Sequence, residues 1–555
     1  MKKYFLPRPA KLQRSGILLY FTFCILHFAF PQNPLVKQWD KRCGGTFHDA
    51  IYSFQQTADG GYILGGESYS DSSGDKTQNN WDATLNSADY WIVKIDSAGG
   101  IEWDKQFGGT ADDYLLCVQQ TADGGYILGG ASESDSSGDK TQNAWGMYDY
   151  WIVKTDSLGV KQWDKRFGGI ANEELYSLQQ TADHGYILGG YSYSDSSGDK
   201  SQHTQGQDDY WMVKIDSLGI KQWDKRFGGS GYDEAYTIEQ TADGGYIMGG
   251  YTTQGISGDV SQALWGGWDY WIVKTNAAGI KLWDKRFGGT NDDVLYSIHQ
   301  TLDHGYILNG CSKSDSTGDK TQNNWDTAAV TYDLWVIKID SLGIKQWDKG
   351  LGGDNDENLA GNVTQTADKG YLIPGTSYSG INGTKTETNL GVEQAWITKT
   401  DSLGNQQWDK TALTDGHDEE GLAVQTSDGC YAIVTATFSG IAGYKTQPNW
   451  DPNGTTYDYW IVKFCDSTLT TASPTPTLPV GEGVAVYPNP AGELLVISDK
   501  GIGNREIEIY DLFGRTVFES ATVIGHSSIT IDVSSLSRGI YFIKAGNEVR
   551  KFVKQ

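Results

Sequence analysis

A nine-residue acidic loop is repeated through the sequence, and its side chains are of the kind that bind cations. The segment "SDSSGDKTQ" occupies residues 70–78, recurs unchanged at 134–142, and returns with one change each at 194–202 and 314–322. Two aspartates four residues apart, with a serine between them, offer the oxygen atoms that Ca²⁺ prefers. The calcium ligands that this pattern predicts are Asp71, Asp75, Asp135, Asp139, Asp195, Asp199, Asp315 and Asp319.

Three degraded copies of the same loop favour a second interpretation. The copies at 254–262, 379–387 and 439–447 lose the first aspartate, yet they keep the central glycine. A glycine-centred turn, whose Asp and Ser side chains accept hydrogen bonds from nearby backbone N–H groups, explains this retention. The sequence therefore favours plain turns and predicts no cofactor other than Ca²⁺. The retained glycines are Gly74, Gly138, Gly198, Gly258, Gly318, Gly383 and Gly443.

A second acidic set lies eight residues before the threonine of each "QT" dipeptide, with Glu357 displaced by one position. Each of these acids opens a predicted strand. That strand is expected to border the central channel of a ring of repeats, so the acids are expected at the rim of the channel. A ring of carboxylates there would hold a cation, whereas capping of the preceding turn needs only local backbone partners; capping is the favoured interpretation. The set consists of Asp49, Asp113, Glu173, Asp233, Asp293, Glu357 and Asp418.

Five of the long loops carry a tryptophan beside Asp or Asn, which is the combination that sugar recognition uses: an apolar ring face for stacking and polar groups for hydroxyls. The alternative is that each indole folds back onto a neighbouring repeat, and the sequence does not decide between the two. Within the set, Trp81 and Trp450 are expected to act together and Trp325 to lie far around the ring. The candidate ligand-binding residues are Trp81, Trp145, Trp265, Trp325 and Trp450.

These loops are positioned by a repeat of about 60 residues. Another tryptophan, in phrases such as "IKQWDKRFGG", recurs with spacings of 64, 60, 60, 60, 64 and 61. One unit contains four runs rich in β-branched and aromatic residues, bounded by Gly, Asp or Asn, and no segment has a helical period. Four antiparallel strands per unit repeated around an axis is the β-propeller solution to unpaired edges. The four runs of that unit are 234–241, 246–253, 269–275 and 280–287.

The first copy of this phrase precedes the first set of the other three runs, and no copy of it follows the last set. Strand 36–43 is therefore expected to pair with 458–464. This predicts an all-β fold: a seven-bladed β-propeller over residues 36–466, closed by the N-terminal strand and monomeric. About 20 Å of strand would separate Cys43 from Cys465, so no bridge joins them. Five cysteines after Cys24, at non-equivalent positions, predict no disulfide framework.

Composition and motifs exclude several functions. A net charge of -26 and a pI near 4.6 argue against nucleic acid and anionic membranes as partners. No metalloprotease, serine-hydrolase or P-loop motif occurs. The histidines are interpreted as scattered, with only His184 and His304 sharing a repeat position, so no enzyme is predicted. A basic start followed by the apolar stretch 16–30 predicts a secretory signal over residues 1–31 and no transmembrane anchor.

The C-terminal part changes character. Residues 467–483 form a Ser/Thr/Pro linker, and residues 484–555 alternate apolar and polar positions as the strands of a small β-sandwich do. The segments "YPNP" (487–490), "IYD" (509–511) and "GIY" (539–541), followed by a basic end, resemble the type A C-terminal sorting domain of the Bacteroidota type IX secretion system. The residues that carry the sorting motif are Tyr487, Pro488, Asn489, Pro490, Gly514, Gly539, Tyr541 and Lys551.

What this resemblance implies is passage through the periplasm and outer membrane, with the type IX machinery as partner and the secreted or outer cell surface as destination. The repeats resemble only a loosely defined class of secreted bacterial proteins, some labelled endoglucanase-like. Two functions follow as hypotheses. The first is a non-enzymatic module that binds a polysaccharide or a surface protein at its loop-rich acidic face. The alternative is a carbohydrate-active hydrolase using carboxylates on that face.

Overall fold

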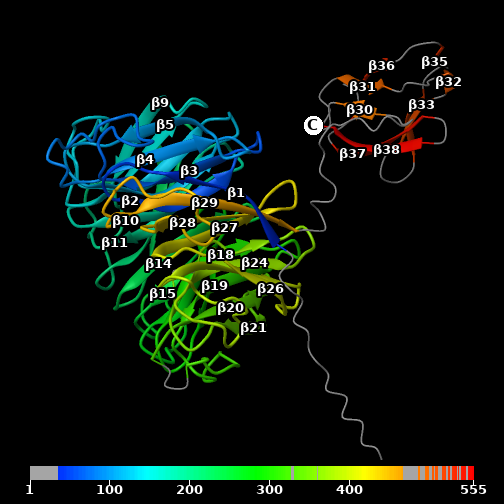
Figure 1. The fold of residues 1–555 in the computed structure, drawn as a ribbon. Helices are drawn as coiled ribbons and strands as arrows, with labels where there is room; N and C mark the ends of the chain where they lie inside the picture. The colour runs from blue at the N-terminus through cyan, green and yellow to red at the C-terminus, as the bar shows by residue number, and fades with distance from the viewer. Residues whose placement is uncertain are drawn as a thin grey trace, which may run out of the picture. The chain divides into compact units, whose positions relative to one another are not determined.

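The computed structural model describes residues 35–466, apart from 327–329 and 359–360, and much of 485–554. The chain divides into two compact units, residues 1–470 and 471–555, which are described separately below. Every regular element in the described residues is a β-strand (Figure 1). The predicted signal segment 1–31 and the linker 467–483 lie outside the described residues.

The larger unit contains seven antiparallel sheets, numbered here in chain order, and each of the first five is a consecutive four-stranded meander. Sheet one comprises β2 (Asp49–Gln56), β3 (Tyr62–Ser68), β4 (Asp89–Ile95) and β5 (Ile101–Phe107). Sheet two comprises β6 (Asp113–Gln120), β7 (Tyr126–Ser132), β8 (Asp149–Thr155) and β9 (Lys161–Phe167). Sheet three comprises β10 (Glu173–Gln180), β11 (Tyr186–Ser192), β12 (Asp209–Ile215) and β13 (Lys221–Phe227). Sheet four comprises β14 (Asp233–Gln240), β15 (Tyr246–Thr252), β16 (Asp269–Thr275) and β17 (Lys281–Phe287). Sheet five comprises β18 (Asp293–Gln300), β19 (Tyr306–Ser312), β20 (Asp333–Ile339) and β21 (Lys345–Leu351).

The two remaining sheets depart from this pattern. Sheet six contains β22 (Glu357–Asn358), β23 (Thr364–Gln365), β24 (Tyr371–Ser377), β25 (Gln394–Thr400) and β26 (Gln406–Thr411). Sheet seven contains β27 (Asp418–Gln425), β28 (Tyr431–Thr437), β29 (Asp458–Asp466) and, as its outer strand, β1 (Leu35–Cys43).

The two middle strands of each sheet are buried along their whole length. In sheet one, β3 and β4 are buried at all seven positions, whereas β5 is buried at only three. Near-continuous burial arises when both faces of a strand are covered. The second and third strands therefore pack between neighbouring sheets, and the core lies between sheets rather than on one side of each.

The repeated "WDK" phrase supplies the acceptor for a buried tryptophan. In sheet one, the indole Nε1 of Trp91 donates to Asp104 Oδ2 (3.1 Å), and the backbone N–H of Thr77 donates to the same carboxylate (3.0 Å). The same two bonds recur in sheet seven, where Asp40 of β1 accepts from Trp460 Nε1 (3.0 Å) and from Thr446 N (2.8 Å). β1 thus supplies sheet seven with the acceptor aspartate that the fourth strand supplies in the other sheets.

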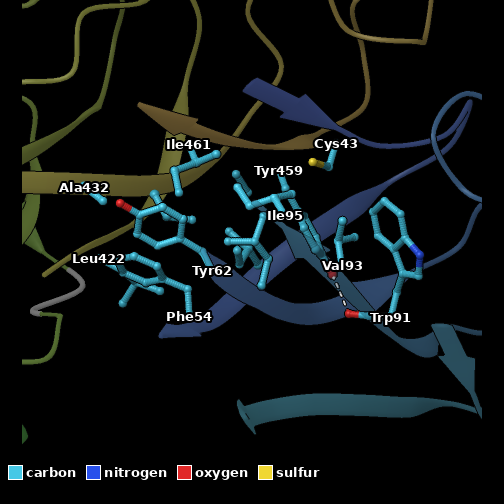
Figure 2. Packing of buried hydrophobic residues seen from close by; sticks show 14 of the residues in the cluster. Cys43, Phe54, Tyr62, Trp91, Val93, Ile95, Leu422, Ala432, Tyr459 and Ile461 are labelled. Atoms are coloured by element: carbon cyan, nitrogen blue, oxygen red, sulfur yellow. Dashed lines mark hydrogen bonds between the residues drawn. The ribbon is translucent and has the colours of Figure 1, made fainter. Parts of the chain in front are cut away.

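The expected pairing of β1 with β29 is present, running from Leu35 opposite Asp466 to Cys43 opposite Tyr459 (Figure 1). One hydrophobic cluster joins this sheet to sheet one and includes residues of β1, β2, β4, β27 and β29 (Figure 2). Across the same junction, Tyr459 donates its hydroxyl hydrogen to the backbone oxygen of Trp91 (3.2 Å), as Tyr90 does to Trp151 (3.0 Å) between sheets one and two. The first and last sheets are therefore packed neighbours.

The cysteines correct one expectation and confirm another. Cys43 lies opposite Tyr459 at the far end of β1, so it does not bridge to Cys465, as predicted. The prediction that no disulfide forms was wrong, because Cys430 and Cys465 are bonded, with 4.3 Å between their Cα atoms. Cys430 immediately precedes β28, whose first residue pairs with Phe464, so the two cysteines face each other one step further along the ladder. Counting cysteines over the whole chain concealed this pair within one sheet.

Sheet six is interrupted in its innermost strand. Its second strand contains Pro374 where the other sheets have Gly, Asn or Val, and proline cannot donate a hydrogen bond to a neighbouring strand. The innermost strand is split into β22 and β23, with one more residue between its acid and its "QT" threonine than sheet one has. This extra residue explains why Glu357 is displaced by one position.

The C-terminal unit contains three antiparallel sheets in its described part. One consists of β30 (Ala485–Tyr487), β31 (Leu494–Ser498) and β36 (Ser528–Asp532). The second consists of β33 (Ile507–Tyr510), β34 (Thr516–Glu519), β37 (Gly539–Ala545) and β38 (Glu548–Lys554), and a third pairs β32 (Gly503–Arg505) with β35 (Val523–Ile524). The strands lie where the alternating pattern placed them, and their packing as a sandwich stays a prediction.

Deleting residues 36–43 is expected to expose β29 as an unpaired edge and to leave the Trp460 indole without its acceptor. An open strand edge is a template for aggregation, and an unpaired buried donor costs about 1–3 kcal/mol. The variant should unfold at lower temperature in calorimetry and elute as oligomers from a sizing column. A variant that melts like the full protein and stays monomeric would contradict this role of β1.

Candidate functional site

The repeated acidic loops are tight turns that the structure ties to their neighbours. Gly74 has φ of +60°, and a Cβ there would lie 2.5 Å from both the Gly44 carbonyl oxygen and the Trp450 ring. Asp71 accepts a hydrogen bond from Asn80 N (3.1 Å) within its own loop, while Asp75 accepts from Trp450 Nε1 (2.9 Å) of the neighbouring sheet. The favoured interpretation, a glycine-centred turn with capping side chains, is therefore the geometry observed.

The second aspartate of the other loops also contacts a side chain outside its own loop. Asp139 accepts from Trp81 Nε1 (2.9 Å), Asp199 pairs with Arg166 (3.3 Å), and Asp319 pairs with Arg286 (3.3 Å). No group of three or more His, Cys, Asp or Glu side chains within the described residues is arranged to hold a metal ion. Calcium binding stays an untested prediction. The first aspartates, Asp135, Asp195 and Asp315, lie in exposed or half-buried parts of their loops.

The acids that open the innermost strands are buried caps. Asp49 accepts from Gly45 N (2.6 Å) and from Ser70 Oγ (3.2 Å), and burial raises its pKa to about 6. Glu357 makes the matching bond to Gly353 N (2.8 Å) in spite of its displacement. Since Asp49 and its counterparts are buried, they offer no open ring of carboxylates to a cation, and turn capping is confirmed. The counterparts are Asp113, Glu173, Asp233, Asp293, Glu357 and Asp418.

A further set of buried acids, which sequence reasoning missed, fixes the tryptophan loops. Asp89 at the start of β4 accepts from Trp81 N (2.9 Å), and Asp458 at the start of β29 accepts from Trp450 N (2.9 Å). Burial raises the pKa of Asp458 to about 8. The aspartate of the recurring "DYW" phrase, which is "DLW" in sheet five and absent from sheet six, was the available signal. The same bond to a loop tryptophan is made by Asp149, Asp269 and Asp333, and Asp209 accepts from Gln205 N at the equivalent place.

The five loop tryptophans combine both interpretations left open by the sequence. Each indole lies against the glycine of the next loop: Trp450 at Gly74 and Trp81 at Gly138, for example. An arginine guanidinium also lies over the ring of Trp450, 4.1 Å from its centroid. The rings nevertheless stay between 39% and 53% exposed, so they are held in place and still face solvent. The set is Trp81, Trp145, Trp265, Trp325 and Trp450.

A cavity of about 800 Å³ is lined by residues of the innermost strands of six sheets and, from sheet six, by Gly361 and Asn362, which lie between β22 and β23. This hub cavity arises from β-bulges: the strand register shifts around one extra residue, such as Tyr52 between Ile51 and Ser53. A bulge re-aims a side chain that would otherwise alternate with its neighbours. The bulged residues of sheets one to five are Tyr52, Leu116, Tyr176, Tyr236 and Tyr296, and all five line the cavity.

The wall of the hub cavity is aromatic and acidic. The rings of Tyr176 and Tyr236 meet edge to face at 4.9 Å, and Tyr236 stacks on Tyr296 at 5.3 Å. Burial is the main cause that raises the pKa of Glu67 to about 7 and that of Glu420 to about 8. The sequence did not reveal this site, because its tyrosines lie at β-bulges. The alternation of apolar and polar residues along a strand does not indicate where a bulge occurs.

A histidine cluster lies at the start of the innermost strand of sheet seven. His417 Nε2 is 2.5 Å from Glu393 Oε2, and its Nδ1 is 2.8 Å from the hydroxyl of Tyr457, which donates to Glu419 (2.8 Å). His48 packs edge to face on the same tyrosine at 5.1 Å. His48 and His417 both immediately precede the capping acid, so the view that only His184 and His304 share a repeat position was wrong.

The sorting-motif residues fall on both sides of what the structure describes. Tyr487 ends β30, Gly539 begins β37, Tyr541 is buried within β37, and Lys551 lies in β38. The predicted motif residues Pro488, Asn489, Pro490 and Gly514 lie outside the described residues.

Comparison with known proteins identifies the C-terminal unit. Residues 485–555 match the family described as "Secretion system C-terminal sorting domain", so the predicted resemblance is confirmed for this part of the chain. This sorting domain, of the type IX system, marks a protein that is secreted or held at the outer cell surface. Among the described residues, no helix has the length and apolar character needed to cross a membrane.

Similarities elsewhere are weaker. The regulatory protein FlaEY of Caulobacter vibrioides is 25% identical over 166 residues, which span 28% of this chain and 17% of that protein. The WD40 domain of Neurospora crassa Pan2 is 9% identical with a TM-score of 0.41, covering 77% of this chain and 95% of that one. A protein of unknown function from Dyadobacter fermentans is 12% identical with a TM-score of 0.38, covering 78% of this chain and 99% of that one.

The buried caps predict that the larger unit is more stable in weak acid than in weak base. The folded pKa values of Asp49 (about 6), Asp418 (about 7) and Asp458 (about 8) all exceed the ordinary value of 3.8, with burial as the largest cause. The folded state therefore holds protons that the unfolded state has released. Their contribution is complete below about pH 4 and is lost as the pH rises through 6 to 8.

Scanning calorimetry should consequently show a melting temperature that falls by several degrees between pH 5 and pH 9. Asp458→Asn, which keeps the shape without the charge, should reduce this slope. Asp59→Asn is the control, because Asp59 has a pKa of about 2 and its carboxyl group does not titrate in this window. A melting temperature that is constant or rises with pH would contradict the assignment of these carboxyl groups as buried caps with raised pKa values.

Proposed function

We propose that the seven sheets form a closed seven-bladed β-propeller. Support comes from β1 completing sheet seven, from the hydrophobic cluster shared by sheets one and seven, and from a cavity to which all seven repeats contribute lining residues. A closed ring leaves no sheet at either end of the row, which is the physical advantage of this architecture.

On this scaffold, we infer that the protein is a secreted, non-enzymatic module that binds polysaccharide. The observation that carries this is the set of five half-exposed tryptophans, each fixed by an Asp bond to its backbone N–H and by the glycine of the next loop. Rings already held in place lose little conformational entropy when a sugar stacks on them. Trp450, Trp81 and Trp145 belong to consecutive loops in the proposed ring and form the longest arc.

A carbohydrate-active hydrolase stays the second candidate, because two carboxyl groups, Glu67 and Glu420, line the same hub cavity. Glycoside hydrolysis needs one carboxyl group as an acid and another as a base or nucleophile. Release of reducing ends from a bound polysaccharide, abolished by Glu420→Gln, would favour this alternative over simple binding. No release by the unchanged protein would remove it.

Pull-down on insoluble polysaccharides tests the binding surface. Stacking on an indole contributes on the order of 1 kcal/mol beyond area burial, so the double variant Trp81→Ala/Trp450→Ala should weaken binding about tenfold or more. Trp325→Ala is the matched control, since Trp325 also lies against the glycine of the next loop but is far from that arc. Trp81→Phe keeps a ring and loses only the bond to Asp139, which separates stacking from loop stability.

Equal binding by all these variants, with melting temperatures unchanged, would show that the tryptophans are not the ligand surface. Capture of a surface protein in place of any polysaccharide would move the ligand class to protein.

Removal of residues 484–555 should leave the larger unit folded but retained in the periplasm, because the sorting domain is confined to residues 485–555. Fractionation of cells producing the shortened chain, with immunodetection in periplasm and medium, checks this. Deletion of the linker segment 471–479 alone is the control and should not block export. The shortened chain appearing in the medium at normal yield would contradict the role of the sorting domain.

A further inference from the structure

We propose that the hub cavity binds a small organic ammonium ion, with Tyr52 and Tyr296 in the aromatic wall and Glu420 as the anionic partner. This site is separate from the tryptophan loops and goes beyond polysaccharide binding. The inference rests on the position of Glu420, on the charges that line the cavity, and on the orientation of its tyrosines.

Glu420 occupies a position that is apolar in the other complete sheets. Counted back from the "QT" threonine, the same place holds Ile51 in sheet one and Leu115 in sheet two, both fully buried in the core. In β27 the register shift takes in two residues, Glu420 and Gly421, and Glu420 has φ of +59°. That left-handed conformation is strained for a residue with a side chain, and strain of this kind concentrates at ligand sites.

The left-handed backbone at Glu420 places its carboxyl group at the cavity wall, where it has no hydrogen-bonding or charged partner in the part of the chain that the structure describes. It accepts no hydrogen bond and forms no ion pair within the described residues, although it lines the hub cavity. Burial, followed by the charges of Glu419, Glu393 and Glu67, raises its pKa to about 8. A bound cation would remove this repulsion, and the protein itself supplies none at the wall.

The charges at the cavity are of one sign. Glu67, Glu174 and Glu420 line it, and none of the residues that line it is Lys, Arg or His. The nearby His48 has its Nε2 atom 3.9 Å from Glu67 Oε1 and has its pKa lowered, mainly by burial, while His417 is bonded to Glu393. Low-dielectric walls focus such a field, so anions are excluded and cations are favoured.

The tyrosines add the second element of cation recognition. Tyr52 and Tyr296 both come close enough to Glu420 for its charge to raise their pKa values, after the larger effect of burial. Bulges turn these rings into the cavity, where they join the Tyr176–Tyr236 wall. The faces of aromatic rings attract ammonium groups. A volume of about 800 Å³ falls in the usual range for small-molecule sites.

Titration calorimetry with the whole protein tests the proposal, using choline and its uncharged analogue 3,3-dimethylbutan-1-ol at pH 8. We expect choline to bind and the analogue, which has the same shape, to bind at least tenfold more weakly. Because the cation stabilises the ionised carboxyl group, the affinity for choline should rise between pH 6 and pH 9, with release of protons to the buffer. Equal affinity for the two compounds, or no binding of choline, would overturn the proposal.

Three variants make the test specific. Glu420→Gln should weaken choline binding at least tenfold, and Glu102→Gln, on the exposed strand β5, should leave it unchanged. Glu420→Gly relieves the left-handed conformation, so it should raise the melting temperature while binding is lost. This outcome separates loss of the site from loss of folding. Trp81→Ala should bind choline normally, which separates failure here from failure of the polysaccharide proposal. Normal choline binding by Glu420→Gly would overturn the role of Glu420.

Discussion

The hydrogen bond from a buried tryptophan to the aspartate of the adjacent outer strand is the contact on which the larger unit depends. Each sheet buries one such indole completely, and its N–H needs an acceptor inside the protein. The same carboxylate also holds the backbone of the long loop, as Asp104 does for Thr77. One residue type at one position therefore connects the packing between sheets to the shape of the loop face, and β1 is present in sheet seven because Trp460 has the same requirement.

The acidic character of the protein follows largely from this kind of capping. Asp49 and Asp89 are buried and each accepts a hydrogen bond from a backbone N–H group, so these acids and their buried counterparts add no free carboxylates to the surface of the loops. The hub cavity is different, because Glu420 accepts no hydrogen bond within the described residues and Glu67 accepts one, from the hydroxyl of Tyr52 (3.4 Å). Both the long loops and the hub cavity are rich in acids. They differ in chemistry because hydrogen-bond donors lie beside the acids of the loops and are few beside the acids of the cavity.

The sequence was a good guide wherever the repeat itself carried the information. The four strands per unit, the pairing of β1 with β29, the turn glycines and the capping acids all follow from comparing internal copies. It was a poor guide to features that belong to one copy or to an inserted residue. The bulges that turn Tyr52 and Tyr296 inward leave no mark on period-two alternation. The Cys430–Cys465 bond joins residues that only the register of neighbouring strands brings together, and the cluster around His417 joins residues beside sheets six and seven that only the packing of these two sheets brings together.

The completion of sheet seven by β1 also fixes an order of events. Leu35 lies near the start of the described chain, whereas its partner Asp466 lies more than 400 residues later. Sheets one to five each consist of strands adjacent in the chain, so their contacts are local. In the last sheet β27, β28 and β29 are likewise adjacent, but β1 can join them only when one very long loop is closed. Until that pairing forms, β1 and the outer edge of β29 are both open, so this is the stage of folding at which the chain is most exposed to wrong pairing and at which shielding by a chaperone would matter most.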